Sequence, residues 1–159
     1  MPLPEFTGRP IRVDLRRSLG PHLAATHIPG RRILLDRAVL DQEGDFERIL
    51  VHEIFHFVWV RLGNSKRRNW EVLLAEELAS KTAGELGYSA EWRKNKLTPA
   101  DIRSRTPVWR RYACESFCDT AAWLYSALNG HEEFTLGRAA RGRRRGWFRE
   151  YIGAHPVSI

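Results

Sequence analysis

The alternation of apolar and polar residues predicts a small sheet near the N-terminus. Residues 11–15 alternate apolar with charged side chains, as expected for a half-buried strand. Residues 22–28 and 32–36 predict two more strands, and Pro29-Gly30 between them is a turn signal. We therefore expect three strands that include at least one antiparallel hairpin.

Residues 46–60 predict a helix that is buried on several sides. Nearly every other position in this range is apolar, and these positions fall on all faces of a helix rather than in one stripe. Asp45 is the expected N-cap, and Gly63-Asn64 should end the helix. Because this helix needs apolar cover, we expect the N-terminal sheet to pack against it.

The middle of the chain predicts further helices. Residues 70–86 form an amphipathic pattern that ends at Gly87, and the inner side of this pattern consists of Leu73, Leu74, Leu78 and Ala79. Residues 89–96 predict a short basic turn or helix. Thr98-Pro99 predicts the start of another brief helix.

Thr106-Pro107 is a clearer helix start, because threonine caps well and proline is tolerated in the first turn. The helix should run to about Leu128, where Asn129-Gly130 forms a stop signal. Together these patterns predict an α+β fold that is mostly helical. A chain of 159 residues fits one domain, residues 1–159.

Composition adds limits on location and partners. The hydrophobic fraction of 43% and the charged fraction of 28% are ordinary for a globular protein. Cys114 and Cys118 are the two cysteines, which excludes a disulfide framework and fits a reducing compartment. Residues 1–6 lack signal-peptide features, and no apolar run reaches membrane-spanning length. We expect a cytoplasmic protein without a membrane partner.

A formal net charge of +7 raises the question of an anionic partner. The basic C-terminal segment, residues 138–159, mixes arginines with aromatic residues, as single-stranded nucleic acid binders do. The favoured interpretation is a terminal helix whose arginines are solvated. Its inward side would consist of Trp147, Phe148, Tyr151 and Ile152. Nucleic acid binding through this basic surface is possible but not favoured.

The strongest chemical signal lies within the buried helix, where His52 and His56 are separated by one helical turn. Two imidazoles on one face can direct their nitrogens at a tetrahedral Zn²⁺ ion. Glu53 would lie beside them and act as a base on a metal-bound water. Buried polar groups of this kind need partners, and a metal ion supplies them.

A catalytic zinc site usually has three protein ligands, and Glu115 is the favoured third ligand. Glu115 and Asp119 lie one turn apart on a largely apolar helix, where two carboxylates without a cation would repel each other. Asp119 is expected to accept the outer N–H of one histidine and so fix its tautomer.

Other residues compete with Glu115 for the third position. Glu76 and Glu77 are expected to be solvated, since Glu77 precedes Lys81 by four residues, the favourable order for a surface ion pair. Cys118 is a rival because thiolate binds zinc well, and Asp119 and His131 remain as alternatives. His22 and His27 are expected to be surface residues of a strand.

The sequence His52-Glu53-x-x-His56 followed by Glu115-x-x-x-Asp119 resembles the gluzincin metallopeptidases. Within that class it looks most like the small ImmA/IrrE-type bacterial peptidase domain. The resemblance covers roughly residues 33–128 and depends on these two motifs. It implies a zincin-like fold in which a small N-terminal sheet packs on the helix that bears the histidines, with glutamate as the third zinc ligand.

The expected function is therefore zinc-dependent hydrolysis of peptide bonds in a peptide or protein substrate, with Glu53 activating the zinc-bound water. Tyr112 and His131 are candidate donors for the oxyanion. The alternative is a non-catalytic, zinc-stabilised basic module that binds nucleic acid or a protein partner. A third hypothesis keeps the helix pattern without any metal and assigns a structural role.

Overall fold

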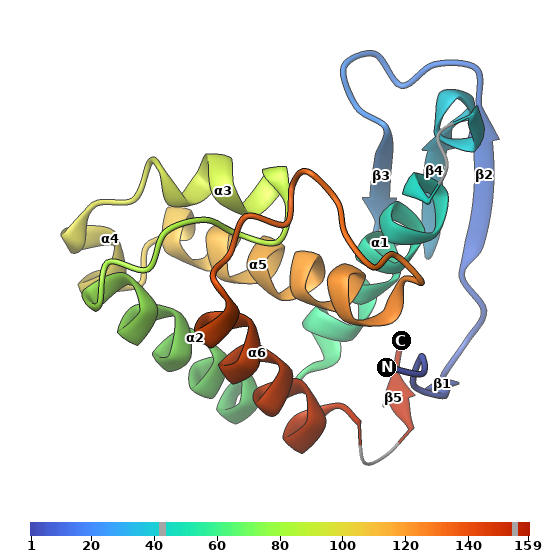
Figure 1. The fold of residues 1–159 in the computed structure, drawn as a ribbon. Helices are drawn as coiled ribbons and strands as arrows, with labels where there is room; N and C mark the ends of the chain where they lie inside the picture. The colour runs from blue at the N-terminus through green and yellow to red at the C-terminus, as the bar shows by residue number, and fades with distance from the viewer. Residues whose placement is uncertain (42–43, 154–155) are drawn as a thin grey trace.

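A three-stranded sheet stands beside a group of helices in the computed structural model, which describes residues 1–41, 44–153 and 156–159 (Figure 1). The strands are β1 (Phe6–Thr7), β2 (Arg12–Arg16), β3 (Ala24–His27), β4 (Arg32–Asp36) and β5 (Val157–Ser158). The helices are η1 (Arg37–Asp41), α1 (Asp45–Arg61), α2 (Asn64–Ala79), α3 (Tyr88–Lys94), α4 (Pro99–Ser104), α5 (Pro107–Tyr125) and α6 (Arg138–Tyr151). The α+β, mostly helical class is confirmed.

The sheet has the order β2-β4-β3. Strand β3 pairs with β4 in the expected antiparallel hairpin, and β2 pairs with β4 in parallel. Ile33 and Leu35 of β4 are fully buried, but Val13 and Leu15 of β2 are exposed. The register places all four on the same face, and β2 is an edge strand that extends beyond the cover of α1. The expectation of a half-buried β2 is therefore wrong for its apolar residues.

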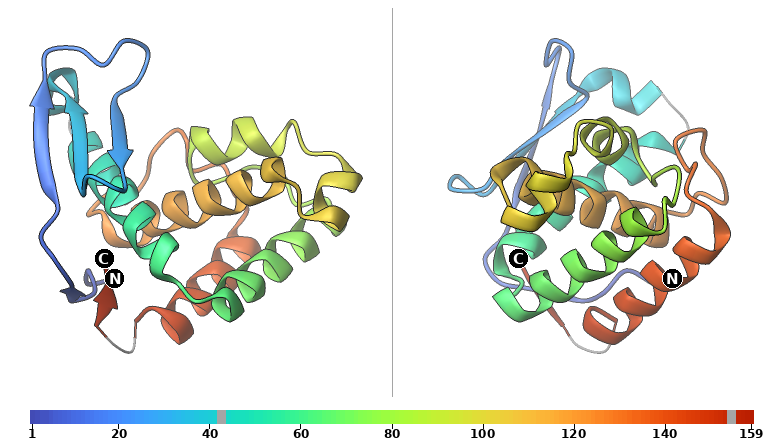
Figure 2. Two further views of the ribbon diagram at one scale, coloured as in Figure 1. Left: turned by 180° about the vertical axis from the view of Figure 1, so that it is seen from behind. Right: turned by 90° about the vertical axis from the view of Figure 1, so that its left-hand side faces the viewer.

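Helix α1 lies between the sheet and α5, as the view from behind shows (Figure 2). Its Ile49 and Phe57 pack with the sheet, and its Phe55, Val58 and Trp59 pack with α5 and α6. This double cover explains why apolar residues occur on all sides of the helix, as the sequence predicted. The sheet does pack on α1.

Several helix boundaries differ from the expected ones, and α5 ends at Tyr125 rather than at about Leu128. The N-cap of α1 is Gly44 rather than Asp45, and the Asp45 carboxylate pairs with Arg48 instead. Helix α2 starts at Asn64, earlier than predicted, because its first turn is polar and gives no apolar periodicity. It ends at Ala79 rather than at residue 86, because Lys81 adopts a left-handed backbone conformation.

The backbone φ of Lys81 is 54°, and a residue in the left-handed region commonly terminates a helix. The backbone N–H of Thr82 donates to the carbonyl of Glu77, which closes this turn. The chain then leaves the helix and carries Glu85 into the interior, where its exposed fraction is 0%. Helices α3, α4 and α5 begin within one residue of their predicted starts.

A buried charged cluster joins α2, α5 and α6. Arg144 of α6 is fully buried and lies 2.8 Å from Glu77 Oε2 and 2.7 Å from Glu85 Oε2. The expectation that Glu77 is solvated is wrong, and the expectation that Arg144 is solvated is also wrong. Arg144 and the two glutamates shield one another from water. The inward packing of Trp147, Phe148 and Ile152 on the same helix is confirmed.

Strands β1 and β5 form a second, two-stranded parallel sheet in which Phe6 pairs with Val157. Sequence patterns did not predict this pairing, because each strand has only two residues. Among the helices that the structure describes, none combines the length and apolar character needed to cross a lipid bilayer.

Candidate metal centre

His52 and His56 lie one turn apart on α1, and their ring centroids are 4.9 Å apart. Both side chains are half-buried, and the ring planes are inclined by 77°. The spacing of four residues places them on one helix face. The prediction that the two imidazoles lie side by side is confirmed.

Cys118 of α5 completes a cluster with these two histidines. Its Sγ lies 3.5 Å from His56 Nδ1. One ligand atom from each of His52, His56 and Cys118 lies within 4.8 Å of the others, close enough to hold a metal ion. Two imidazoles and a thiolate form a donor set that suits zinc. Cys118, the rival third ligand, thus belongs to the cluster.

Glu115 borders the same cluster from the side of His52. Its Oε2 lies 3.3 Å from His52 Nε2, and its Oε1 lies 3.2 Å from Arg93 Nη2. Two ligand atoms around a tetrahedral zinc with bonds of about 2.0–2.1 Å lie roughly 3.3–3.4 Å apart. The spacing of Nε2 and Oε2 is compatible with a shared ion and equally with a direct ion pair, and Glu115 does not belong to the group formed by His52, His56 and Cys118.

Asp119 holds the other nitrogen of the His52 ring. Its Oδ1 lies 2.7 Å from His52 Nδ1, while its Oδ2 accepts the backbone N–H of Ala90 at 3.0 Å. A side chain at Gly87 would place a Cβ atom within 2.3–2.5 Å of this carboxylate. The absence of a side chain there lets Asp119 sit where it can orient His52, as the sequence predicted.

Glu53 is buried, with 8% of its surface exposed, and a residue of β3 fixes it. Thr26 Oγ1 donates to Glu53 Oε2 at 2.5 Å, and it also lies 3.2 Å from the Glu53 carbonyl oxygen. One carboxylate oxygen is thereby engaged by the sheet. The contact explains how the hairpin next to α1 positions the carboxylate.

A pocket of about 510 Å³ opens onto His52 and Glu53. It lies between the β2–β3 loop, α1 and α3. Its remaining lining residues are Pro21, His22, Leu23, Ala24, Arg48, Ile49, Tyr88, Ser89, Trp92, Arg93, Asp119 and Glu133. The volume is within the usual range for small-molecule sites, about 300–1,000 Å³.

The charges around the cluster are strongly coupled. Burial disfavours the charged form of His52, but Asp119, Glu115 and Glu53 raise its pKa well above the ordinary value. Burial also opposes ionisation of Glu115, yet contact with His52 and the nearby His56 and Arg93 lowers its pKa to about 2. The negative carboxylates thus attract positive charge to this position, which a divalent cation would satisfy.

The two thiols differ in character. Contact with Cys118 is the largest influence on Cys114, and together with His56 it lowers the pKa of Cys114 to about 6 despite burial. Burial raises the pKa of Cys118 well above the ordinary value. A metal ion that binds a thiol deprotonates it, so this high pKa does not prevent coordination.

The two candidate oxyanion donors are placed away from the pocket. The Tyr112 hydroxyl donates to Glu85 Oε1 at 2.6 Å, within the buried charged cluster. His131 Nε2 lies 3.3 Å from Asp45 Oδ1, and His131 Nδ1 accepts the backbone N–H of Glu133. Neither residue lines the pocket, so these two expectations are corrected.

The remaining candidates are also accounted for. Glu76 is exposed, as predicted, and Glu77 pairs with Arg144 far from the histidines. His22 and His27 are exposed strand and loop residues, and His22 lies at the edge of the pocket.

Sequence reasoning missed Thr26, Trp92 and Arg93. Thr26 gave no signal beyond its place in a predicted strand. Trp92 and Arg93 belong to the short basic segment 89–96, and only the packing of α3 against α5 brings them to the pocket. No protein-family model, curated protein or solved structure matches this chain.

Proposed function

We propose that this protein is a zinc-dependent metallopeptidase. The observation that supports the proposal best is the shared pocket of His52 and Glu53, because it puts one residue of the metal-donor cluster and a carboxylate base beside the same space. A histidine buried for packing alone would have no reason to face a pocket together with a glutamate, as His52 does with Glu53.

His52 and His56 would hold the ion, with a third donor from α5. Cys118 and Glu115 are the two residues suited to that role, since Cys118 belongs to the donor group with both histidines and Glu115 lies beside His52. A zinc ion bound there supplies Lewis acidity, which lowers the pKa of a water molecule and polarises a carbonyl group.

Glu53 would accept the proton of the attacking water and pass it to the leaving amine. Thr26 holds Oε2 of this carboxylate at 2.5 Å, so the other oxygen remains available for the proton. Holding the carboxylate on the rigid hairpin limits its motion and keeps the base in one orientation.

Asp119 and Arg93 would position the other groups. Asp119 binds Nδ1 of His52 and leaves Nε2 to face the ion. Arg93 lines the pocket, and its Nη2 lies next to Glu115. Its remaining N–H groups are the donors best placed to bind a substrate carbonyl oxygen.

The test is Glu53→Gln, assayed on a peptide library with zinc-loaded protein. Zinc content should stay at the wild-type level, while hydrolysis falls by a factor of about 100 or more. Glu76→Gln, an exposed glutamate on α2, is the matched control and should leave both unchanged. Zinc retention together with undiminished hydrolysis in Glu53→Gln would contradict the proposed role.

A second candidate function follows from the presence of two donors on α5. If Glu115 and Cys118 both bind, the ion has four protein ligands and no open position, which is typical of structural zinc. The protein would then be a zinc-stabilised basic module for nucleic acid or a protein partner. Chelation would unfold such a module, whereas it would only inactivate a peptidase with a stable apo form. DNA affinity that falls steeply with salt would support the module.

A further inference from the structure

A second pocket, of about 320 Å³, lies at the C-terminal end of α1, beside α2 and the start of α5. It is separate from the candidate metal centre and shares no lining residue with it. Its lining is dominated by arginines and consists of Trp59, Asn64, Arg67, Arg68, Glu71, Arg105 and Arg110. Four cations and one carboxylate therefore face this space.

The single carboxylate is already neutralised. Glu71 accepts from Arg105 Nε at 2.6 Å and from Arg105 Nη2 at 2.8 Å, so both of its oxygens are engaged by one guanidinium. The two charges cancel each other. Within residues 1–41, 44–153 and 156–159, the other three arginines of the pocket form no ion pair.

Arg67 gives the second, independent observation. Its Nε is buried and has no hydrogen-bond partner among the residues that the structure describes. Its guanidinium lies 6.0 Å from the ring centre of Trp59, which restricts where the group can move. Nε is enclosed by protein, so the two Nη groups of Arg67, for which the described residues supply no hydrogen-bond acceptor, are the donors open to a ligand in the pocket.

We propose that this pocket binds a phosphate group, either as the free ion or as a phosphate monoester. Three unpaired guanidinium groups offer more charge than one carboxylate ligand would need, and they match a dianion with several acceptor oxygens. The volume lies at the lower end of the usual range of about 300–1,000 Å³ for small-molecule sites, so an organic group can accompany the phosphate. Asn64 adds an amide donor at the start of α2.

The experiment is calorimetric titration of the full chain with inorganic phosphate and, in a separate arm, with phenyl phosphate, at constant ionic strength. Wild-type protein should bind at least one of them with a stoichiometry of one. Arg67→Met should weaken binding about tenfold or more, because it removes charge-assisted hydrogen bonds. Tighter binding of phenyl phosphate would identify a monoester as the ligand, and tighter binding of inorganic phosphate would identify the free ion.

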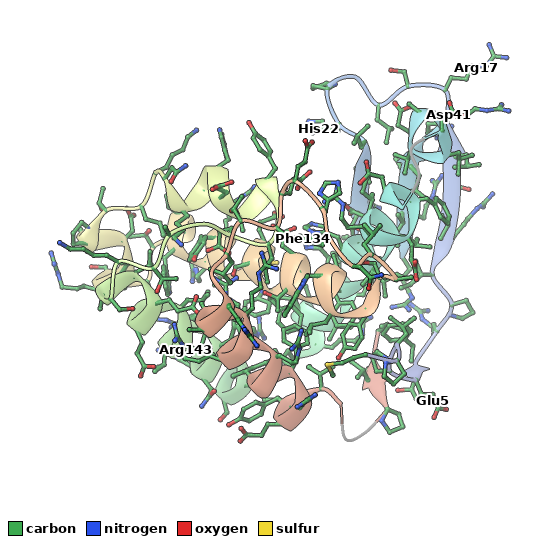
Figure 3. All side chains as sticks on the ribbon, in the orientation of Figure 1. Glu5, Arg17, His22, Asp41, Phe134 and Arg143 are labelled. Atoms are coloured by element: carbon green, nitrogen blue, oxygen red, sulfur yellow. The ribbon has the colours of Figure 1, made fainter. Side chains whose placement is uncertain are left out.

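Arg110→Met is a second test variant that removes an exposed side chain and should also weaken binding. Arg17→Met is the control, since Arg17 is exposed at the far end of the fold from α4 (Figure 3). It removes the same charge without touching the pocket and should leave the affinity unchanged. Absence of binding in both arms, or equal weakening in Arg17→Met and Arg67→Met, would overturn the proposal. Neither outcome bears on the metal centre.

Discussion

Asp119 and His52 are joined by a contact of 2.7 Å between Oδ1 and Nδ1, across the packed faces of α1 and α5. This contact leaves Nε2 of His52 directed toward Glu115, at 3.3 Å from Oε2. One ring thus connects two carboxylates of the same helix. The orientation of the imidazole depends on a residue that is not itself one of the proposed metal ligands.

Asp119→Asn tests that dependence. An amide cannot stabilise the ring as a carboxylate does, so zinc affinity should fall by a factor of about 10–100. Competition with a chromogenic chelator measures the effect. Glu132→Gln, an exposed acid outside the site, should leave the affinity at the wild-type value. Unchanged affinity in Asp119→Asn would show that the contact does not support metal binding.

The identity of the third donor can be read from cobalt-substituted protein. If Cys118 coordinates the ion, the spectrum should contain a thiolate-to-cobalt charge-transfer band that disappears in Cys118→Ser. If Glu115 coordinates, Glu115→Gln should reduce the metal content instead. Cys114→Ser serves as the thiol control. Loss of metal in both Cys118→Ser and Glu115→Gln would favour four protein ligands and the structural module.

Arg144→Met should destabilise the fold strongly. The substitution leaves Glu77 and Glu85 buried without their shared cation, which typically costs about 3–5 kcal/mol. Urea denaturation followed by fluorescence measures the free energy of unfolding. Arg149→Met, on the same helix but exposed, should change it by less than about 0.5 kcal/mol. Similar stability of the two variants would contradict a stabilising role for the cluster.

Acidification should lower the free energy of unfolding, and Glu85 is a group through which it acts. Burial opposes its ionisation, but Arg144, Lys94 and Tyr112 lower its pKa below the ordinary value of 4.5. A carboxyl group with a lower pKa in the folded state stabilises the fold above its unfolded pKa, and this contribution is lost as the pH falls below that value. Unfolding free energy should therefore drop on acidification from pH 5 toward about pH 3. Glu85→Gln should flatten that part of the pH profile.

Local patterns predicted the elements well, because helix and strand periodicity depends on neighbouring residues. The pairing of His52 with His56 is of this kind, since a four-residue spacing on a helix fixes it. Contacts between residues far apart in the sequence were harder to predict. Glu77 and Arg144 are 67 residues apart, and each resembled a solvated residue in its own helix.

The candidate site shows the same difference between local patterns and contacts made by distant segments. Asp119 was placed correctly because a carboxylate on an apolar helix needs a partner. Thr26 and Arg93 could not be found, because their roles depend on how β3 and α3 pack against α1 and α5. Tyr112 was misassigned because Glu85, from another segment, accepts the hydrogen bond of its hydroxyl group.

Gly87 extends the influence of the site to a position that no chemical motif marks. Any side chain there would collide with the carboxylate of Asp119, whose atoms would lie within 2.3–2.5 Å of the new Cβ. The displaced carboxylate would release the His52 ring, although the substituted residue touches neither histidine. Variation in the connection before α3 can therefore impair the centre as severely as loss of a donor, and a screen restricted to polar residues would overlook it.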